Sequence, residues 1–110
     1  VKLSVNVNKV ATVRNSRGGS TPSVLEAVVV CIDSGASGLT GHPRADGRHI
    51  TKADGHAVAA FLQPMRGRIE FNIEGGPRPA LLELVHAGKP AQGTLVPVHP
   101  GEITSQAGWP

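Results

Sequence analysis

The sequence has few aromatic residues, one cysteine and no long apolar run, and each shortage argues against a class of protein. Its 110 residues include two Phe, one Trp and no Tyr, which leaves little aromatic surface for stacking nucleic-acid bases. The single cysteine, Cys31, excludes an internal disulfide and indicates a reducing compartment. No apolar stretch approaches the roughly 18 to 20 residues that span a bilayer, and no signal-like segment opens the chain. We therefore expect a soluble cytoplasmic protein that does not enter membranes.

Basic residues are concentrated near the amino terminus. The formal net charge is only +3, but four cations precede the first acidic residue, Glu26: Lys2, Lys9, Arg14 and Arg17. Such a cluster suits nucleic acid, a membrane surface or small phosphorylated substrates. Because aromatic residues are scarce, we expect small phosphorylated substrates as partners and no nucleic acid.

Hydrophobic periodicity predicts strands that alternate with helices. We predict strands over residues 3–8, 38–42, 68–74 and 93–97, and helices over residues 24–34, 51–63 and 79–87. Ser23 or Thr21 is the expected cap of the first helix, and Thr51 with Asp54 forms a capping box for the second. Residues 9–23 are interpreted as a loop with room for a short helical turn at its start.

The polar sides of the strands distinguish two kinds of α/β fold. Strands of an open sheet with helices on both faces are usually apolar on both sides. Here residues 4, 6 and 8 of the first strand and residues 70, 72 and 74 of the third are polar, while the alternate positions are apolar. We therefore predict an α/β fold, the amino-terminal half of one (β/α)8 TIM-barrel domain over residues 1–110, with four parallel strands and three helices. A whole barrel needs about 250 residues, so we expect a piece of a longer protein.

Active sites of such barrels lie at the carboxyl ends of the strands. The residues predicted there are Asn6, Asn8, Lys9, His42, Arg44, Glu74 and Thr104. His42 and Glu74 are a reasonable pair for proton transfer, because histidine titrates near neutrality and burial raises the pKa of a carboxyl group. Each also has a structural interpretation, His42 as a hydrogen-bonded strand end and Glu74 as the partner of an arginine.

The segment from His42 to His49 is rich in groups that bind anions or metals. His42, Asp46 and His49 are candidate metal ligands, but their spacing matches no standard ligand pattern and nearby arginines disfavour a divalent ion. Anion binding is favoured, because arginine grips phosphate with a planar fork. Arg14 and Arg17 allow a second anion pocket, although an arginine in Arg14's position is more often a solvated loop residue.

Several motifs together resemble the pyridoxine 5′-phosphate synthase family. They are the opening run from Val5 to Gly18, the segment from Gly38 through His42-Pro43-Arg44 to Thr51, Asn72-Ile73-Glu74, and Leu95-Val96-Pro97 followed by Glu102-Ile103-Thr104. The resemblance covers the whole chain in register. It departs from the commoner family pattern at Asn8-Lys9, where many members have Asp-His, and at Gly41, where they have a larger aliphatic residue.

The resemblance implies a (β/α)8 barrel enzyme of the transferase class that acts in vitamin B6 biosynthesis. Such an enzyme condenses 1-deoxy-D-xylulose 5-phosphate with 3-amino-2-oxopropyl phosphate to pyridoxine 5′-phosphate and inorganic phosphate, with neither metal nor organic cofactor. By resemblance, His42 and Glu74 are acid/base groups, and Asn6 and Arg17 hold the aminoketone phosphate. By the same resemblance, the deoxyxylulose phosphate is bound by Asn8, Lys9, Arg44, His49 and Thr104.

Assembly and catalytic competence are further expectations. We expect the full-length protein to be a homo-oligomer and the 110 residues alone to be inactive. Two alternatives remain open at the level of sequence. One is a noncatalytic phosphate-binding half-barrel, and the other is a nucleic-acid-binding domain, which would bind in a salt-sensitive manner.

Overall fold

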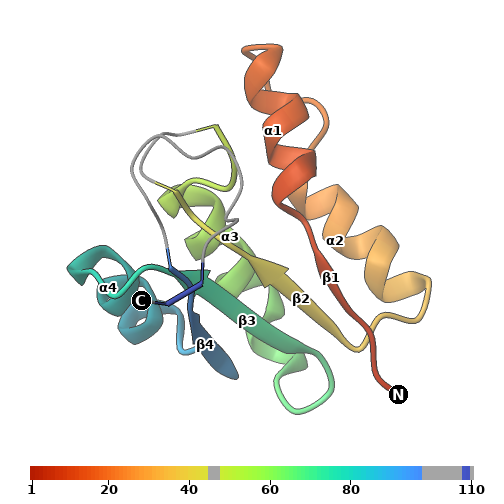
Figure 1. The fold of residues 1–110 in the computed structure, drawn as a ribbon. Helices are drawn as coiled ribbons and strands as arrows, with labels where there is room; N and C mark the ends of the chain where they lie inside the picture. The colour runs from red at the N-terminus through yellow and green to blue at the C-terminus, as the bar shows by residue number, and fades with distance from the viewer. Residues whose placement is uncertain (45–47, 98–107, 110) are drawn as a thin grey trace.

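The computed structural model describes residues 1–44, 48–97 and 108–109 (Figure 1). Its elements are β1 (Ser4–Asn6), α1 (Asn8–Ser16), α2 (Val24–Asp33), β2 (Gly38–Gly41), α3 (Lys52–Leu62), the 3-10 turn η1 (Gln63–Met65), β3 (Glu70–Gly75), α4 (Pro79–Gly88) and β4 (Gln92–Leu95). Over these ranges, no helix combines the length and the apolar character that crossing a membrane requires.

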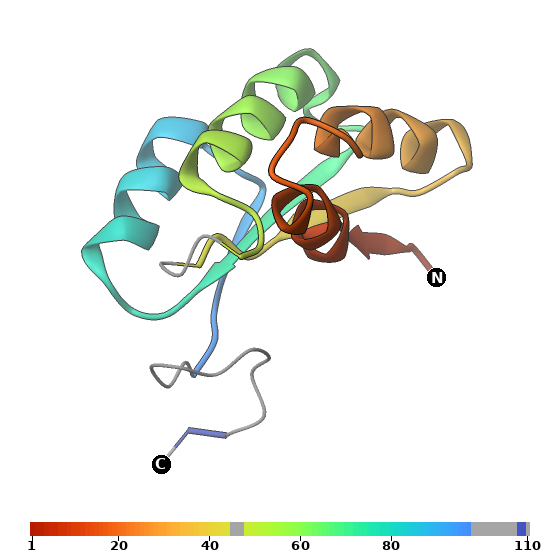
Figure 2. The same cartoon turned by 90° about the horizontal axis from the view of Figure 1, so that it is seen from above.

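The four strands form one parallel sheet in the order β1-β2-β3-β4, so neighbours in the sequence are neighbours in space. Helices α2, α3 and α4, which connect successive strands, lie on the same side of this sheet (Figure 2). Parallel strands in sequential order with all connecting helices on one side are the arrangement of half a (β/α)8 barrel. The predicted fold class is confirmed.

The face of the sheet toward the helices forms the hydrophobic core. Leu39 and Ile73 are fully buried there, and Phe71 is 6% exposed. They belong to one cluster with helix residues that include Val28, Val58 and Leu84. Burying an aliphatic or aromatic side chain of this size contributes about 1.5 to 3 kcal/mol, so this layer is the main source of stability.

The other face of the sheet is polar and is linked by hydrogen bonds between side chains. The Ser4 and Thr40 hydroxyl oxygens lie 2.7 Å apart across β1 and β2. The Thr94 hydroxyl donates to Asn72 Oδ1 at 2.8 Å across β3 and β4. The predicted separation of apolar and polar sides is therefore confirmed.

The structure has four α-helices in its described residues where the sequence predicted three. The additional helix is α1, in the segment interpreted as a loop. Ala11 in this helix is completely buried, and Val10 packs against the core cluster, so one face of the segment is anchored. Three β-branched residues (Val10, Thr12 and Val13) have modest helix propensity, and tertiary packing overrides it.

The predicted helix starts are confirmed in detail. Ser23 Oγ accepts a hydrogen bond from the Glu26 amide at 3.2 Å. Thr51 and Asp54 form the reciprocal capping box. The predicted end of the third helix is wrong by one residue, because α4 includes Gly88 and the left-handed residue is Lys89, with φ 46°.

Gly88 has a packing role instead of a terminating one. A Cβ added at Gly88 would lie 3.0 Å from Ala59 Cβ on α3, so the missing side chain permits the two helices to approach. The glycine is thus explained by a neighbouring helix rather than by a left-handed turn.

Candidate functional site

The predicted site residues from three neighbouring strands meet at the carboxyl edge of the sheet. Asn6 ends β1, His42 follows the last residue of β2, and Glu74 is the next-to-last residue of β3. The register pairs Gly41 with Ile73, so His42 continues the alignment opposite Glu74. Neighbouring strands lie about 4.8 Å apart, which puts a histidine and a carboxylate on adjacent strand ends.

Asn6 and Asn8 organise the turn between β1 and α1. Asn6 Oδ1 accepts a hydrogen bond from the Asn8 amide at 2.8 Å, which satisfies a donor at the start of α1. Asn8 Oδ1 in turn accepts from the backbone amide of His42 at 2.8 Å. Asn8 therefore ties the end of β1 to the end of β2 and fixes the backbone position of His42.

His42 and His49 are both buried, with 6% and 3% of their surface exposed. Arg44 is half-buried, and its backbone amide donates to the Ile50 carbonyl at 3.3 Å, which draws together the two described ends of the segment from 44 to 50. The predicted contributions of His42, Arg44 and His49 to one region are consistent with this placement.

Glu74 lies on the polar face beside β4, where its strand partner is Thr94. Burial raises the pKa of the Glu74 carboxyl group above its ordinary value. No hydrogen bond or ion pair to its carboxylate occurs within the described part of the chain. A carboxyl group whose pKa is raised holds a proton more readily than an ordinary glutamate, which suits a group that passes protons to and from a substrate.

Lys9 and Arg17 stand at opposite ends of α1. Lys9 lies in the first turn and is exposed, and Arg17 is the exposed residue that caps the carboxyl end of the helix. At about 1.5 Å per residue, the nine steps from Asn8 to Arg17 span about 14 Å. The structure therefore brings Lys9 to the carboxyl edge of the sheet but does not group Arg17 with Asn6.

The prediction that Arg14 is available for an anion is wrong. Arg14 Nη1 and Nη2 donate to the two carboxylate oxygens of Asp54, each at 2.6 Å, and Nε and Nη2 donate to Asn15 Oδ1 at 3.0 and 2.8 Å. The two charged side chains are only 15% and 13% exposed. Sequence reasoning missed this contact because the partners are 40 residues apart, and the only signal was Asp54 itself at a capping position.

Two predicted positions cannot be placed. Thr104 and Asp46 both lie outside the described residues. In the ranges that are described, no three His, Cys, Asp or Glu side chains gather in a way that could hold a metal ion. The expectation of a site without metal stays a prediction, since Asp46, one of the three candidate ligands, lies outside the described residues.

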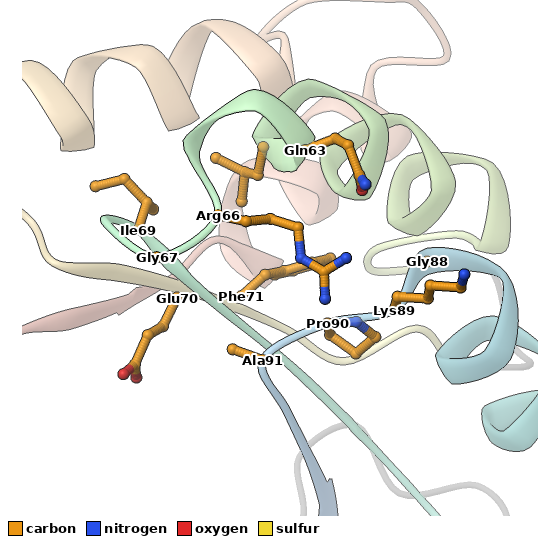
Figure 3. A pocket seen from close by; sticks show the side chains of 11 residues that line it. Gln63, Arg66, Gly67, Ile69, Glu70, Phe71, Gly88, Lys89, Pro90 and Ala91 are labelled. Atoms are coloured by element: carbon orange, nitrogen blue, oxygen red, sulfur yellow. The ribbon is translucent and has the colours of Figure 1, made fainter.

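The structure has a pocket of about 270 Å³ at the opposite end of the strands. Leu62, Phe71 and Pro90 contribute apolar groups to its lining. Figure 3 shows the Arg66 side chain reaching toward Phe71 and Pro90, with Lys89 next to Pro90. The pocket adjoins the first residues of β3 and the segment before β4, away from His42 and Glu74. It contains none of the predicted site residues and is separate from the candidate site.

Comparisons with known proteins identify close relatives. The chain is 54% identical over 116 residues to the pyridoxine 5'-phosphate synthase of Leptospira biflexa serovar Patoc, which covers 98% of the chain and 45% of that protein. It is 53% identical over 108 residues to the pyridoxine 5'-phosphate synthase of Bacteroides thetaiotaomicron, covering 98% and 44%. The corresponding synthase of Xanthomonas oryzae pv. oryzae is 49% identical over 116 residues, covering 99% and 45%.

The chain thus spans less than half the length of the curated relatives that it matches. A family model described as pyridoxal phosphate biosynthesis protein PdxJ matches residues 3–110, which include β1 to β4 and every predicted site residue. Because this match covers nearly the whole sequence, the chain belongs to the PdxJ family of pyridoxal phosphate biosynthesis proteins.

Proposed function

We propose that this chain supplies part of the active site of a pyridoxine 5′-phosphate synthase. The observation that carries the proposal is the meeting of Asn6, Asn8, His42 and Glu74 at one edge of the sheet. The relatives named above are pyridoxine 5'-phosphate synthases, which supports the same activity here. The reaction would condense 1-deoxy-D-xylulose 5-phosphate with 3-amino-2-oxopropyl phosphate, forming pyridoxine 5′-phosphate and inorganic phosphate.

His42 and Glu74 are the proposed acid/base groups. Imine formation, loss of water and ring closure each require that a proton leave one atom and arrive at another. A buried imidazole and a carboxyl group whose burial raises its pKa are residue types that carry protons in acid/base catalysis. No step in this scheme requires a metal or an organic cofactor, so none is proposed.

The remaining site residues are proposed to bind the two phosphorylated substrates. Asn8, Lys9, Arg44, His49 and Thr104 would hold the deoxyxylulose phosphate, and Asn6 with Arg17 the aminoketone phosphate. Asn8 has a second role in the fold, because its Oδ1 accepts from the His42 amide while Nδ2 faces no partner within the described residues. The joint role of Asn6 and Arg17 would need a substrate or a chain movement that spans the length of α1.

Assembly and location are part of the same proposal. We propose that the full-length protein acts in the cytoplasm as a homo-oligomer on small phosphorylated molecules. Sedimentation of the purified protein and fractionation of cells would test these two points independently of catalysis.

The test is the formation of pyridoxine 5′-phosphate from the two substrates by the full-length protein. His42→Ala and Glu74→Gln should each lower kcat by about 10²- to 10⁴-fold, the usual contribution of acid/base catalysis. Glu70→Gln is the matched control, because Glu70 lies on the same strand and face but at its exposed amino end. Phosphate binding without turnover in the wild type would favour a noncatalytic module instead.

A further inference from the structure

The buried contact of Arg14 with Asp54 belongs to a larger set of hydrogen bonds that joins α1 to α3. We call Arg14, Asn15 and Asp54 the α1–α3 clamp. Four hydrogen bonds from the Arg14 guanidinium end on Asp54 and Asn15, at distances from 2.6 to 3.0 Å. A planar fork that faces both oxygens of a carboxylate fixes direction as well as distance, and a lysine cannot reproduce it.

Asp54 has a second set of contacts at the start of α3. Its Oδ2 accepts from the Thr51 amide at 2.9 Å, and its own amide donates to the Thr51 hydroxyl at 3.1 Å. Burial alone would raise the pKa of Asp54, but hydrogen bonds from Arg14 and Thr51 outweigh it and hold the pKa below its ordinary value. Asp54 is therefore ionised at neutral pH and connects α1 to the residue at which α3 begins.

Asn15 extends the clamp to the predicted substrate-binding segment. Its Oδ1 accepts from Arg14, and its Nδ2 donates to the backbone carbonyl of His49 at 2.9 Å. The next residue, Ile50, accepts from the Arg44 amide through its own carbonyl at 3.3 Å. The clamp thus reaches the backbone that positions both His49 and Arg44.

The clamp also determines where α1 lies relative to this segment. Helix α1 begins with Asn8 and Lys9, and Arg17 caps its far end. Without the clamp, α1 would be attached through the Asn8 contact at its start and through the packing of Val10 and Ala11. The distance between the proposed substrate-binding groups on α1 and those near His49 would then no longer be fixed.

We propose that Arg14, Asn15 and Asp54 are positioning residues that hold Arg44 and His49 in register with Asn8 and Lys9 for phosphate binding. This inference rests on the proposed function for its substrates. None of the three clamp side chains is required to touch substrate. Their effect is on geometry, and misplacement of binding groups by about 1 Å can cost about 100-fold in rate.

The experiment compares three variants of the full-length protein. Asn15→Asp keeps the acceptor for Arg14 but removes the donor to the His49 carbonyl, and Arg14→Lys keeps the charge but removes the fork. Lys52→Ala is the matched control, because Lys52 also lies on α3 and its ion pair with Glu83 on α4 is exposed, with side chains 55% and 69% exposed. Should Arg14→Lys fail to fold, Asn15→Asp decides the question alone.

The readouts are KM and kcat for both substrates well below the melting temperature, the affinity for inorganic phosphate by calorimetry, and the NMR signals of His49. Both clamp variants should raise KM and weaken phosphate binding by about 10- to 100-fold, with shifted His49 signals. Lys52→Ala should change none of these. Clamp variants that melt at lower temperature yet match Lys52→Ala in phosphate affinity would reduce the clamp to a structural role and overturn the proposal.

The two proposals fail in distinguishable ways. A wild-type protein that binds phosphate but forms no pyridoxine 5′-phosphate would overturn the proposed function, while weaker phosphate binding by Asn15→Asp would still support the clamp. A KM and a phosphate affinity that Asn15→Asp leaves unchanged, in a protein that does form pyridoxine 5′-phosphate, would overturn the clamp alone. A wild type with neither phosphate binding nor turnover would overturn both.

Discussion

The two faces of the sheet use the same strands for different purposes. On the face toward the helices, Leu39 and Ile73 are fully buried and contribute stability through removal of apolar surface from water. On the opposite face, Thr40 and Asn72 occupy neighbouring positions and make single hydrogen bonds across strands. A hydrogen bond of this kind contributes about 0.5 to 1.5 kcal/mol net. The difference shows that the helix-covered face contributes most of the stability, whereas the polar face leaves hydrogen-bonding groups at the surface where the candidate site lies.

The largest effect should follow from a cavity on the helix-covered face. Leu39→Ala should lower the free energy of unfolding by about 2 to 5 kcal/mol, because the side chain is fully buried and its neighbours cannot collapse into the space. Urea denaturation measures the change. Leu82→Ala on α4 is the matched control, since that leucine is 59% exposed. Equal losses in the two variants would contradict the assignment of the core.

A smaller loss of stability should follow from a substitution at Gly38, where the backbones of β2 and β3 approach closely on the polar face. A Cβ at Gly38 would lie 2.9 Å from the backbone oxygen of Glu70, which cannot move without disturbing the sheet. Gly38→Ala should therefore lower the free energy of unfolding by about 1 to 3 kcal/mol.

The control for this prediction lies on the same strand and the other face. At Gly41 the nearest atoms to an added Cβ are 3.9 Å away, on Ile50 and Phe71. Gly41→Ala should be neutral or should stabilise by up to about 1 kcal/mol, because it restricts the unfolded chain. A larger loss for Gly41→Ala than for Gly38→Ala in urea denaturation would reverse the contrast between the faces.

Features that depend on local spacing could be predicted from the sequence. The caps at Ser23 and Thr51 and the alternation in β3 follow from residues a few positions apart. The placement of His42 and Glu74 at neighbouring strand ends was also predictable, because parallel strands bring their carboxyl ends to one edge whatever their separation in sequence.

Features that depend on distant contacts could not be predicted. Helix α1 is stabilised by burial of Ala11 and by contact of Arg14 with Asp54, and neither is visible in the local pattern. An arginine in a basic run has the same sequence appearance whether it faces solvent, phosphate or a carboxylate. This ambiguity explains why Arg14 was predicted as an anion ligand although it forms an ion pair with Asp54.

The smallest effect concerns the charge of Glu74 on the polar face. A raised pKa means that the folded state holds the proton more tightly than the unfolded state. The contribution of this group to stability is fully present below the unfolded pKa and is lost as pH rises through the folded pKa. Glu74→Gln should therefore raise the free energy of unfolding more at pH 7 than at pH 4. The difference should be less than about 1 kcal/mol, because water screens a half-exposed carboxylate.

Asp54 should act in the opposite direction, because its lowered pKa contributes stability above the unfolded value that is lost as pH falls. Urea midpoints of wild type and Glu74→Gln at the two pH values give the sign, and Glu70→Gln on the same strand provides the matched change of charge. A Glu74→Gln variant that is less stable at pH 7 than at pH 4, relative to wild type, would show that Glu74 is a structural ion-pair partner. A variant that is more stable but has lost turnover would show that the partly buried Glu74 carboxylate lowers stability and is needed for catalysis.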